Sequence, residues 1–160
     1  MPIYMQFDGI EGDSNAHHHE RWHEVFSFSW GESLSVSGGG GGGGSTGRVN
    51  MSDLSVMKRS GKGSPQFMHA CASGKLLPAV QMEVVLSSGE QEIIYQRWTL
   101  TNVMITSFQV SGSGGEAPTE SLSLNYSKIK YEQAVRAADG SVRYQNAIWD
   151  LRANAGSVTP

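Results

Sequence analysis

The residues with the clearest chemical potential lie in the segment HHHERWHE, residues 17–24, which contains an H-E-x-x-H string. In zinc metalloproteases this string lies on a helix, so that two imidazoles reach one metal ion and the glutamate acts as general base. Here the three positions are His19, Glu20 and His23. The string therefore raises a zinc hydrolase hypothesis, which requires a helix through these residues.

The residues that follow the string do not favour a helix. Apolar and small polar residues alternate in VFSFSWG, and this two-residue period is typical of a β-strand. A metzincin continuation would require Gly at position 26 and His at position 29, where the chain has Phe26 and Ser29. We therefore interpret the string as a chance match in a polar loop whose histidines face solvent. We expect no catalytic zinc, no other bound metal and no cofactor.

Other catalytic arrangements are not apparent. The single cysteine, Cys71, stands between two alanines in a helical pattern and is interpreted as a buried, inert thiol. One cysteine also excludes an intrachain disulfide and a zinc site built from cysteines. Carboxylates are scattered singly, so their spacing nominates no acid/base pair. We expect a protein that is not an enzyme.

Charge and hydropathy exclude two further classes. Twelve Lys and Arg residues against fifteen Asp and Glu give a formal net charge of −3, without the concentrated basic patch of a nucleic-acid-binding protein. No apolar run approaches the ~20 residues of a membrane span. The N-terminal MPIYMQFDGIEG lacks the basic and apolar regions of a signal peptide, so we expect synthesis in the cytoplasm without Sec-type export.

Alternating apolar residues recur along the chain and predict β-strands. In VFSFSW, we expect Phe26, Phe28 and Trp30 to face the core, which directs Ser27 and Ser29 to the opposite face. Further strand patterns are IYMQFD, RVNMSDLSVMK, AVQMEVVL, EIIYQRWTL, NVMITSFQV, ESLSLNYSKIKY and VRYQNAIWDL. About seven or eight strands and one short helix predict a mainly β chain that forms a closed or nearly closed β-barrel with the helix on its flank.

Two local features accompany these strands. In RVNMSDLSVMK the alternation changes phase near residues 52–53, which predicts a β-bulge. The helix is predicted to begin after Ser64 as N-cap, with Pro65 in its first position, and to end before Gly74. Three of its residues are predicted to share one face, namely Phe67, Met68 and Cys71.

A run of seven glycines separates two strand patterns, one ending near Val36 and one starting near Val49. Its members are Gly38, Gly39, Gly40, Gly41, Gly42, Gly43 and Gly44. The segment before the run is too short for a stable domain of its own, since chains below ~40 residues usually need a disulfide or a metal. We therefore predict a single domain, residues 1–160, with a long loop at about residues 37–47. Loops of this length are often functional.

Five collinear segments together resemble the haemolysin-coregulated protein (Hcp) family, the tube subunits of bacterial type VI secretion systems. The segments are FDGIEGDS, EVFSFSWGES, GRVNMSDLSVMKR, SPQFMHACASGK and GEAPTESLSLNYSKIKYE. The resemblance runs from about residue 3 to residue 132, and the tail from about residue 133 resembles the C-terminal end of some members. The chain departs from the family pattern in the histidine-rich residues 15–19 and in the purity of its glycine run.

The resemblance implies hexameric rings that stack into a tube inside a contractile sheath, capped by a spike protein and fired into a neighbouring cell. It therefore implies a protein of the bacterial cytoplasm that is later secreted to the extracellular space or into a target cell. The lumen is implied to hold small effector proteins. In family members the strand at residues 26–30 lines the channel, so Ser27 and Ser29 are expected to face the lumen. The glycine loop is expected to contact the next ring.

Three other interpretations stay open at this point. The first is a zinc hydrolase centred on His19, Glu20 and His23. The second is a monomeric β-barrel module that binds a small ligand or a protein partner. The third is the tube protein of a related contractile injection system.

Overall fold

The computed structural model describes residues 1–36 and 46–160. Within them the chain forms strands and one helix in the following order: β1 (Ile3–Phe7), β2 (His23–Ser29), β3 (Glu32–Val36), β4 (Thr46–Met51), β5 (Leu54–Arg59), α1 (Ser64–Ser73), β6 (Leu76–Ser88), β7 (Gln91–Ser111), β8 (Thr119–Asn125), β9 (Lys128–Arg136), β10 (Val142–Asp150) and β11 (Ala155–Thr159).

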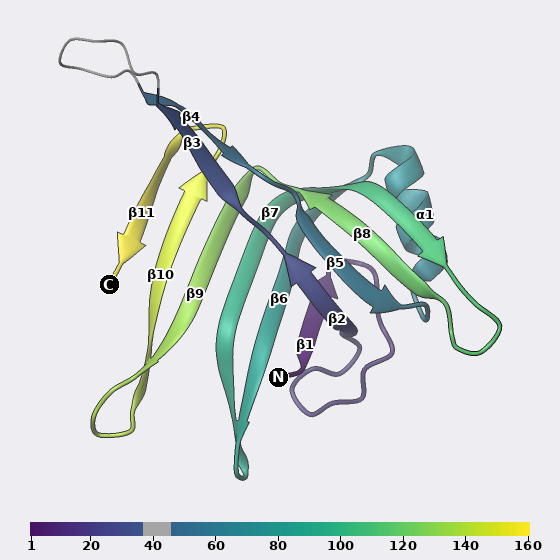
Figure 1. Ribbon diagram of the computed structural model, residues 1–160, viewed down its shortest axis with the longest axis horizontal. Helices are drawn as coiled ribbons and strands as arrows, with labels where there is room; N and C mark the ends of the chain where they lie inside the picture. Colours follow the sequence, from purple (N-terminus) through teal and green to yellow (C-terminus); the bar gives the residue numbers. More distant parts are fainter. Residues whose placement is uncertain (37–45) are drawn as a thin grey trace.

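Six strands close into a barrel because β8 pairs with β5 on one side and with β7 on the other. Around the barrel the order is β7, β6, β1, β2, β5, β8 and again β7, and every pairing is antiparallel. Strands β9, β10 and β11 continue the sheet from β7 away from the barrel (Figure 1). The prediction of a mainly β chain with a closed barrel and one short helix is confirmed.

Strand β7 is longer than the sequence pattern indicates. The two predicted strands EIIYQRWTL and NVMITSFQV form one strand of 21 residues. Asn102, with φ +53°, lies where β7 changes partners. Residues 96–101 pair with β9, whereas residues from Met104 onward pair with β8. One strand therefore belongs first to the outer sheet and then to the barrel wall. The chain past residue 133 holds part of β9 and all of β10 and β11.

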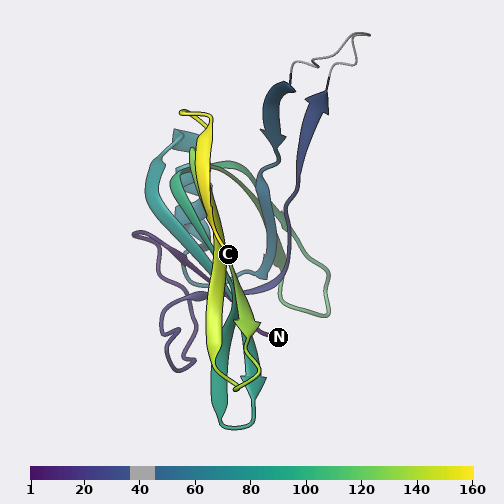
Figure 2. The same ribbon diagram turned by 90° about the vertical axis from the view of Figure 1, so that its left-hand side faces the viewer.

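The predicted β-bulge at residues 52–53 is wrong. Strand β4 ends at Met51 and β5 begins at Leu54, and the two strands belong to different sheets. Among the described residues β4 pairs with β3 alone, in a two-stranded hairpin that leaves the barrel and projects beyond it (Figures 1 and 2). The change of phase in the sequence marks the exit of the hairpin from the barrel wall.

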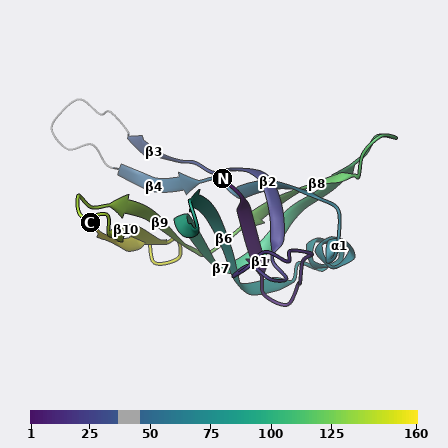
Figure 3. The same cartoon turned by 90° about the horizontal axis from the view of Figure 1, so that it is seen from below.

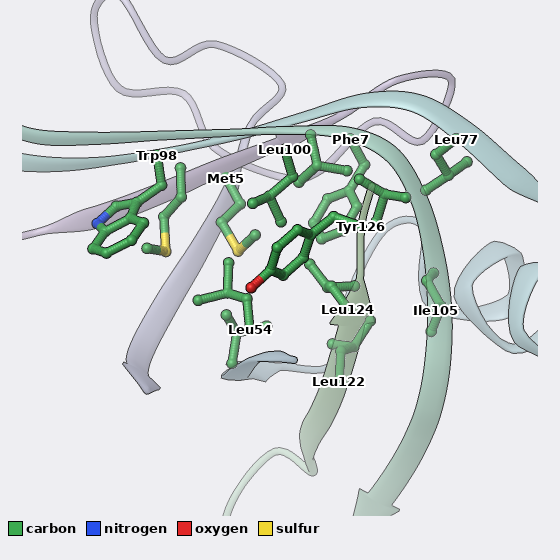
Figure 4. Packing of buried hydrophobic residues seen from close by; sticks show 14 of the residues in the cluster. Met5, Phe7, Leu54, Leu77, Trp98, Leu100, Ile105, Leu122, Leu124 and Tyr126 are labelled. Carbon is green, nitrogen blue, oxygen red and sulfur yellow. The ribbon is translucent and has the colours of Figure 1, made fainter. Parts of the chain in front are cut away.

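The core lies inside the barrel, where alternate residues of its strands point inward (Figure 4). Leu54, Leu122 and Leu124 are fully buried on β5 and β8. The helix closes one end of the barrel, because Phe67 is also fully buried and its ring centroid lies 4.8 Å from that of Phe7. Burying these side chains contributes about 1.5–3 kcal/mol each to folding.

The ends of α1 are set by two glycines with positive φ. The N-cap is Gly63, with φ +92°, and not Ser64, which is the first helical residue. A Cβ at Gly63 would lie 2.9 Å from the Glu11 carbonyl oxygen, so close packing requires glycine there. At the other end Gly74, with φ +64°, caps the helix as predicted.

The buried face of α1 differs in part from the prediction. Phe67 and Ala70 are buried and Cys71 is half-buried, whereas Met68 is 64% exposed. The prediction that Met68 shares one face with Phe67 and Cys71 is therefore wrong for the buried face. Phe67 and Ala70 are three residues apart and lie on the same side of the helix, which is the side turned to the barrel.

Candidate assembly surfaces

Residues 19–23 do not form a helix. His18 and Arg21 both have positive φ, so the chain reverses direction twice around the H-E-x-x-H string before β2 begins. His19 Nε2 lies 3.2 Å from Glu83 Oε1, and His23 Nε2 donates a hydrogen bond of 2.9 Å to the Ile10 carbonyl oxygen. The two imidazoles thus have different partners and do not share a metal-ligand geometry.

The prediction that the histidines face solvent is wrong for two of them. His19 and His23 are each only 2% exposed, while the preceding histidines of the run, His17 and His18, are exposed. The His19 ring stacks on Tyr4, with centroids 4.4 Å apart, and its edge meets Trp22. Burial of His19 therefore depends on partners from β1 and β6, which the local sequence does not reveal.

Glu83 lies on the outer face of the barrel and links His19 to charged residues on the neighbouring strands. Its second carboxylate oxygen lies 2.9 Å from Arg97 Nη2 on β7, and Arg97 Nη1 lies 3.5 Å from Glu132 on β9. This hydrogen bond and these two ion pairs connect the loop that contains His19 to the adjacent strands β6, β7 and β9. Partial burial tends to lower the pKa of Arg97, but these two carboxylates raise it overall.

A second polar cluster lies inside the barrel, beneath α1. Lys58 on β5 and Glu120 on β8 pair directly across the two strands, and Lys58 Nζ lies 3.0 Å from Glu120 Oε2. The same ammonium donates to the Arg59 carbonyl oxygen at 2.8 Å and lies 5.4 Å from the centre of the Phe67 ring. These contacts satisfy a charge that is costly to bury alone.

Serine side chains form a continuous band on the outer face of four adjacent strands. The band follows the pairing register of β2, β5, β8 and β7, whose side chains alternate between the core and this face. One row across the strands consists of Ser29, Ser55, Ser123 and Ser107, and the next consists of Ser27, Met57, Ser121 and Gln109. We call this surface the serine face. Ser27 and Ser29 are exposed on it, on the side opposite the core as predicted.

Phe26 was wrongly assigned to the core. A register shift between Val25 and Ser27 inserts one extra residue into β2, and Phe26 is 53% exposed with the Arg59 guanidinium 5.6 Å from its ring centre. The other two aromatic residues of that pattern, Phe28 and Trp30, are partly buried and pack against the core. The bulge keeps Val25 and Phe28 on the inner face, and this leaves Phe26 outside.

The base of the β3–β4 hairpin is fixed to the barrel by hydrogen bonds. The Gly31 N–H donates to Ser52 Oγ and the Ser52 N–H donates to the Gly31 carbonyl oxygen, both at 2.9 Å. Tyr126 accepts a hydrogen bond from Trp30 Nε1 and donates one of 2.9 Å to the Ser52 carbonyl oxygen. The direction of the hairpin is therefore set where it leaves the barrel.

Between the hairpin and the outer sheet lies an apolar cleft of about 810 Å³, which we call the hairpin cleft. Its lining residues come from β3 and β4 on one side and mainly from β9, β10 and β11 on the other, and Figure 3 shows where β3, β4, β9 and β10 lie. The hairpin contributes Glu32, Leu34 and Met51, and the aromatic floor includes Trp98 and Trp149. The remaining lining residues are Trp30, Ser33, Gly47, Val49, Ile129, Tyr131, Ala147, Ile148, Asn154, Gly156, Ser157 and Val158.

The predicted loop at residues 37–47 lies mostly outside the described residues. Its flanks are described: β3 ends at Val36, as predicted, and β4 begins at Thr46, three residues earlier than Val49. The two strands joined by the loop pair with each other and with no other strand of the described chain. The loop thus starts and ends at the tip of the hairpin, as far from its base as the described chain extends.

The sequence profile of a family described as "Type VI secretion system effector, Hcp" matches residues 4–133. The chain belongs to this family. The expectation from the sequence segments is thereby confirmed, with nearly the same limits as the predicted match. Hcp proteins are structural rather than enzymatic, so the H-E-x-x-H string of this Hcp chain serves no catalysis.

Individual relatives agree with this assignment. Protein hcp1 of Pseudomonas aeruginosa is 34% identical over 160 residues, which cover 96% of this chain and 97% of that protein. A solved structure described as a type six secretion system protein is similar with a TM-score of 0.89 and 26% identity, and covers 98% of this chain and 99% of its own. Hcp1 from Salmonella typhimurium is similar with a TM-score of 0.77, 25% identity and 98% coverage of each chain.

Within the described residues no helix has the length and apolar character that crossing a membrane requires.

Proposed function

We propose that this Hcp chain is a structural subunit of the inner tube of a type VI secretion system. In this proposal six copies form a ring, and rings stack into a tube that a contractile sheath propels behind a spike protein. The protein is made in the bacterial cytoplasm and leaves the cell when the system fires. The observation that carries the proposal is a pair of unpaired strand edges on opposite sides of the serine face.

The first edge belongs to β2 and the second to β7. Within the described residues β1 pairs with β2 only as far as Val25, so residues 26–29 have a partner on the β5 side alone. β6 pairs with β7 only up to Met104, so residues 105–111 have a partner on the β8 side alone. Unpaired edges are templates for pairing with another chain.

The directions of these strands permit such pairing around a ring. β2, β5, β8 and β7 are antiparallel in turn, so β2 and β7 run in opposite directions. The free edge of β7 in one copy can therefore pair antiparallel with the free edge of β2 in the next. The contact joins two different surfaces, as a closed ring with head-to-tail interfaces requires.

In such a ring the serine face of each copy would continue into that of its neighbour. The bands containing Ser27 and Ser29 would line the lumen. Small hydroxyl groups present short polar side chains without net charge, which suits a wall that holds and releases small effector proteins. Met57 lies in the second row of the serine face and the exposed Phe26 precedes Ser27 on β2, and both provide apolar contacts for such cargo.

The glycine loop is proposed to join rings. It starts at the tip of a hairpin whose base is fixed by Gly31, Ser52 and Tyr126, and whose strands project beyond the barrel (Figure 2). A projecting element of fixed direction can reach a ring stacked on the first. The seven glycines, residues 38–44, place no side chain between the two surfaces.

Negative-stain electron microscopy of the purified full-length chain, with light scattering over a range of protein concentrations, tests the proposal. We expect rings with six-fold symmetry and a mass of six subunits. A uniform monomer at every concentration would overturn it and would favour the alternative of a monomeric binding module that uses the hairpin cleft.

A further inference from the structure

We propose that the hairpin cleft of one copy receives the corner formed by Leu76 and Met104 of the next copy in the ring. The inference rests on the proposed function, because it names the second surface through which neighbouring subunits hold each other. It assigns an occupant to a cleft that residues 1–36 and 46–160 leave unfilled.

The cleft has the character of an incomplete core. The cleft has a volume of about 810 Å³, it is open to solvent, and its lining is mainly apolar. Leu34 and Val36 of the hairpin are 52% and 65% exposed, and Val158 of β11 is 74% exposed. In addition, the indole Nε1 of Trp149 is buried and has no hydrogen-bond acceptor among the described residues. Buried donors normally have an acceptor, so this side of the cleft lacks one polar contact of a completed core.

The Leu76–Met104 corner is apolar and exposed, as the cleft is, and it lies on the other side of the molecule. Leu76 at the start of β6 and Met104 on β7 face each other across the two strands. They are 49% and 40% exposed, whereas the adjacent pair, Leu77 and Val103, is fully buried. Leu76 and Met104 therefore point away from the core of their own barrel. The end of the Met104 side chain lies next to Gly74 at the end of α1, where a Cβ would be 3.6 Å from the Met104 methyl group.

The pairing of strands proposed for the ring brings corner and cleft together. Met104 pairs with Asn125 on β8. The residue before Asn125, Leu124, pairs with Leu54 at the start of β5. Met104 thus lies at the same end of the sheet as the base of the hairpin. Beyond that base, β3 prolongs β2 on the edge where the β7 edge of the neighbouring copy would lie. The corner of the neighbour then stands at the open side of the cleft.

The face of the sheet on which the cleft opens also agrees with this arrangement. Phe28 on β2 and Trp30, between β2 and β3, pack on the barrel core. Trp30 also lines the cleft, together with Leu34 on β3. The cleft therefore opens on the core side of the sheet and not on its serine face. In the neighbouring copy the Leu76 strand lies on that same side, because β6 covers the barrel away from β5 and β8.

Charge complementarity supports the same partner. Lys75 is exposed beside Leu76, and Glu32 is exposed at the rim of the cleft where β3 begins. Figure 1 shows the hairpin and α1 at opposite sides of the molecule, so one chain cannot fill its own cleft with its own corner. A second copy can, and a head-to-tail ring repeats the contact at every joint.

Disulfide trapping tests the contact directly. In a Cys71→Ser chain we introduce Leu34→Cys and Leu76→Cys together and oxidise the assembled protein. We expect a ladder of covalently linked subunits on a non-reducing gel. The matched control carries Ala138→Cys in place of Leu76→Cys; Ala138 is exposed in the β9–β10 turn, and this pair should give no ladder.

Charge reversal tests the contact without new cysteines. Glu32→Lys and Lys75→Glu should each raise the protein concentration at which rings dissociate by roughly tenfold, because like charges meet across the interface. The double variant should return most of the way to the wild-type value. Both substitutions are at exposed positions, so folding of all three variants is checked by an unchanged circular dichroism spectrum and melting curve of the dissociated chain.

The outcomes separate this inference from the proposed function. Rings that form in microscopy, yet give no Leu34–Leu76 ladder and no rescue in the double charge reversal, overturn the inference and leave the ring intact. A chain that never forms rings overturns both. A ladder together with rescue supports the assigned contact.

Discussion

Lys58 and Glu120 lie directly opposite each other on β5 and β8, and their charged groups meet at 3.0 Å with side chains that are 4% and 0% exposed. The pair is held at the end of the barrel that α1 closes. A buried ion pair adds little stability relative to apolar residues of the same size, but breaking it leaves one charge without a partner.

Lys58→Met should therefore lower the free energy of unfolding by about 3–5 kcal/mol, since Glu120 is left buried and alone. The double variant Lys58→Met, Glu120→Leu should recover most of that loss. Urea unfolding of each variant at the same protein concentration measures both values. Equal stabilities for wild type and the single variant would contradict the prediction.

His19→Ala should loosen the loop before β2, because it removes the Tyr4 stack and the contact with Glu83. We expect the free energy of unfolding to fall by about 1–3 kcal/mol, because the buried Glu83 carboxylate is left with one fewer partner. Amide hydrogen exchange should quicken at Gly12 and Ser14, whose N–H groups donate to carbonyl oxygens within this loop. His17→Ala serves as the control and should leave these amides unchanged.

Stability should fall as the pH falls below about 6.5, through His23. Burial lowers the pKa of His23, and although the hydrogen bond to the Ile10 carbonyl opposes this effect, the net shift is downward from 6.5. The unfolded chain then binds the proton at a higher pH than the folded chain. The contribution of neutral His23 is therefore complete above 6.5 and is lost as the pH falls toward the folded-state pKa.

His23→Gln cannot take up this proton and keeps a hydrogen-bond donor for Ile10. Its free energy of unfolding should change less between pH 7.5 and pH 5 than that of the wild type. Urea titrations at several pH values in this range give the free energy of unfolding of both proteins. If it changes equally with pH in both, His23 does not contribute.

Deletion of residues 38–44 should leave rings intact and abolish their stacking, because the proposed contact between rings uses this loop. Electron microscopy distinguishes single rings from tubes. A variant of unchanged length, in which Gly39, Gly41 and Gly43 are replaced by serine, should still stack. Tubes of normal length in the deletion variant would show that the loop does not join rings.

A label at position 29 should lie inside the ring. We suggest Ser29→Cys in the Cys71→Ser chain, coupled to a polyethylene glycol maleimide after assembly. Averaged ring images should gain density at the centre. The same label on Ala138→Cys should add density elsewhere and leave the centre clear. Central density absent from the labelled Ser29→Cys rings would remove Ser29 from the lumen wall.

Much of the barrel could be predicted because alternation reports directly which side of a strand is buried. On β5 and β8 the pattern places Leu54, Val56, Leu122 and Leu124 inside, and the structure agrees. The pattern fails at Phe26, where one inserted residue reverses the faces without any unusual residue type. A two-residue period contains no information about where such an insertion lies.

The histidines show a different limit. Nothing near residue 19 announces that its imidazole will be buried, because Glu83 lies 64 residues away in the chain. Likewise, a glycine at position 63 and a serine at position 64 are both acceptable N-caps by residue type. The Glu11 carbonyl oxygen lies so close to residue 63 that this position requires glycine, and this tertiary contact favours Gly63 as the N-cap. Such contacts come from the tertiary arrangement, and local propensities do not encode them.

The serine face has four strands per copy, and this even number has a geometric consequence for assembly. After each subunit the strand direction returns to its starting value, so antiparallel pairing imposes no parity on the number of subunits in a closed ring. A ring of five, six or seven copies would satisfy the backbone equally well. In the proposed ring the number of copies is then set by curvature, and the proposed contact between the Leu76–Met104 corner and the neighbouring hairpin fixes the angle between adjacent copies.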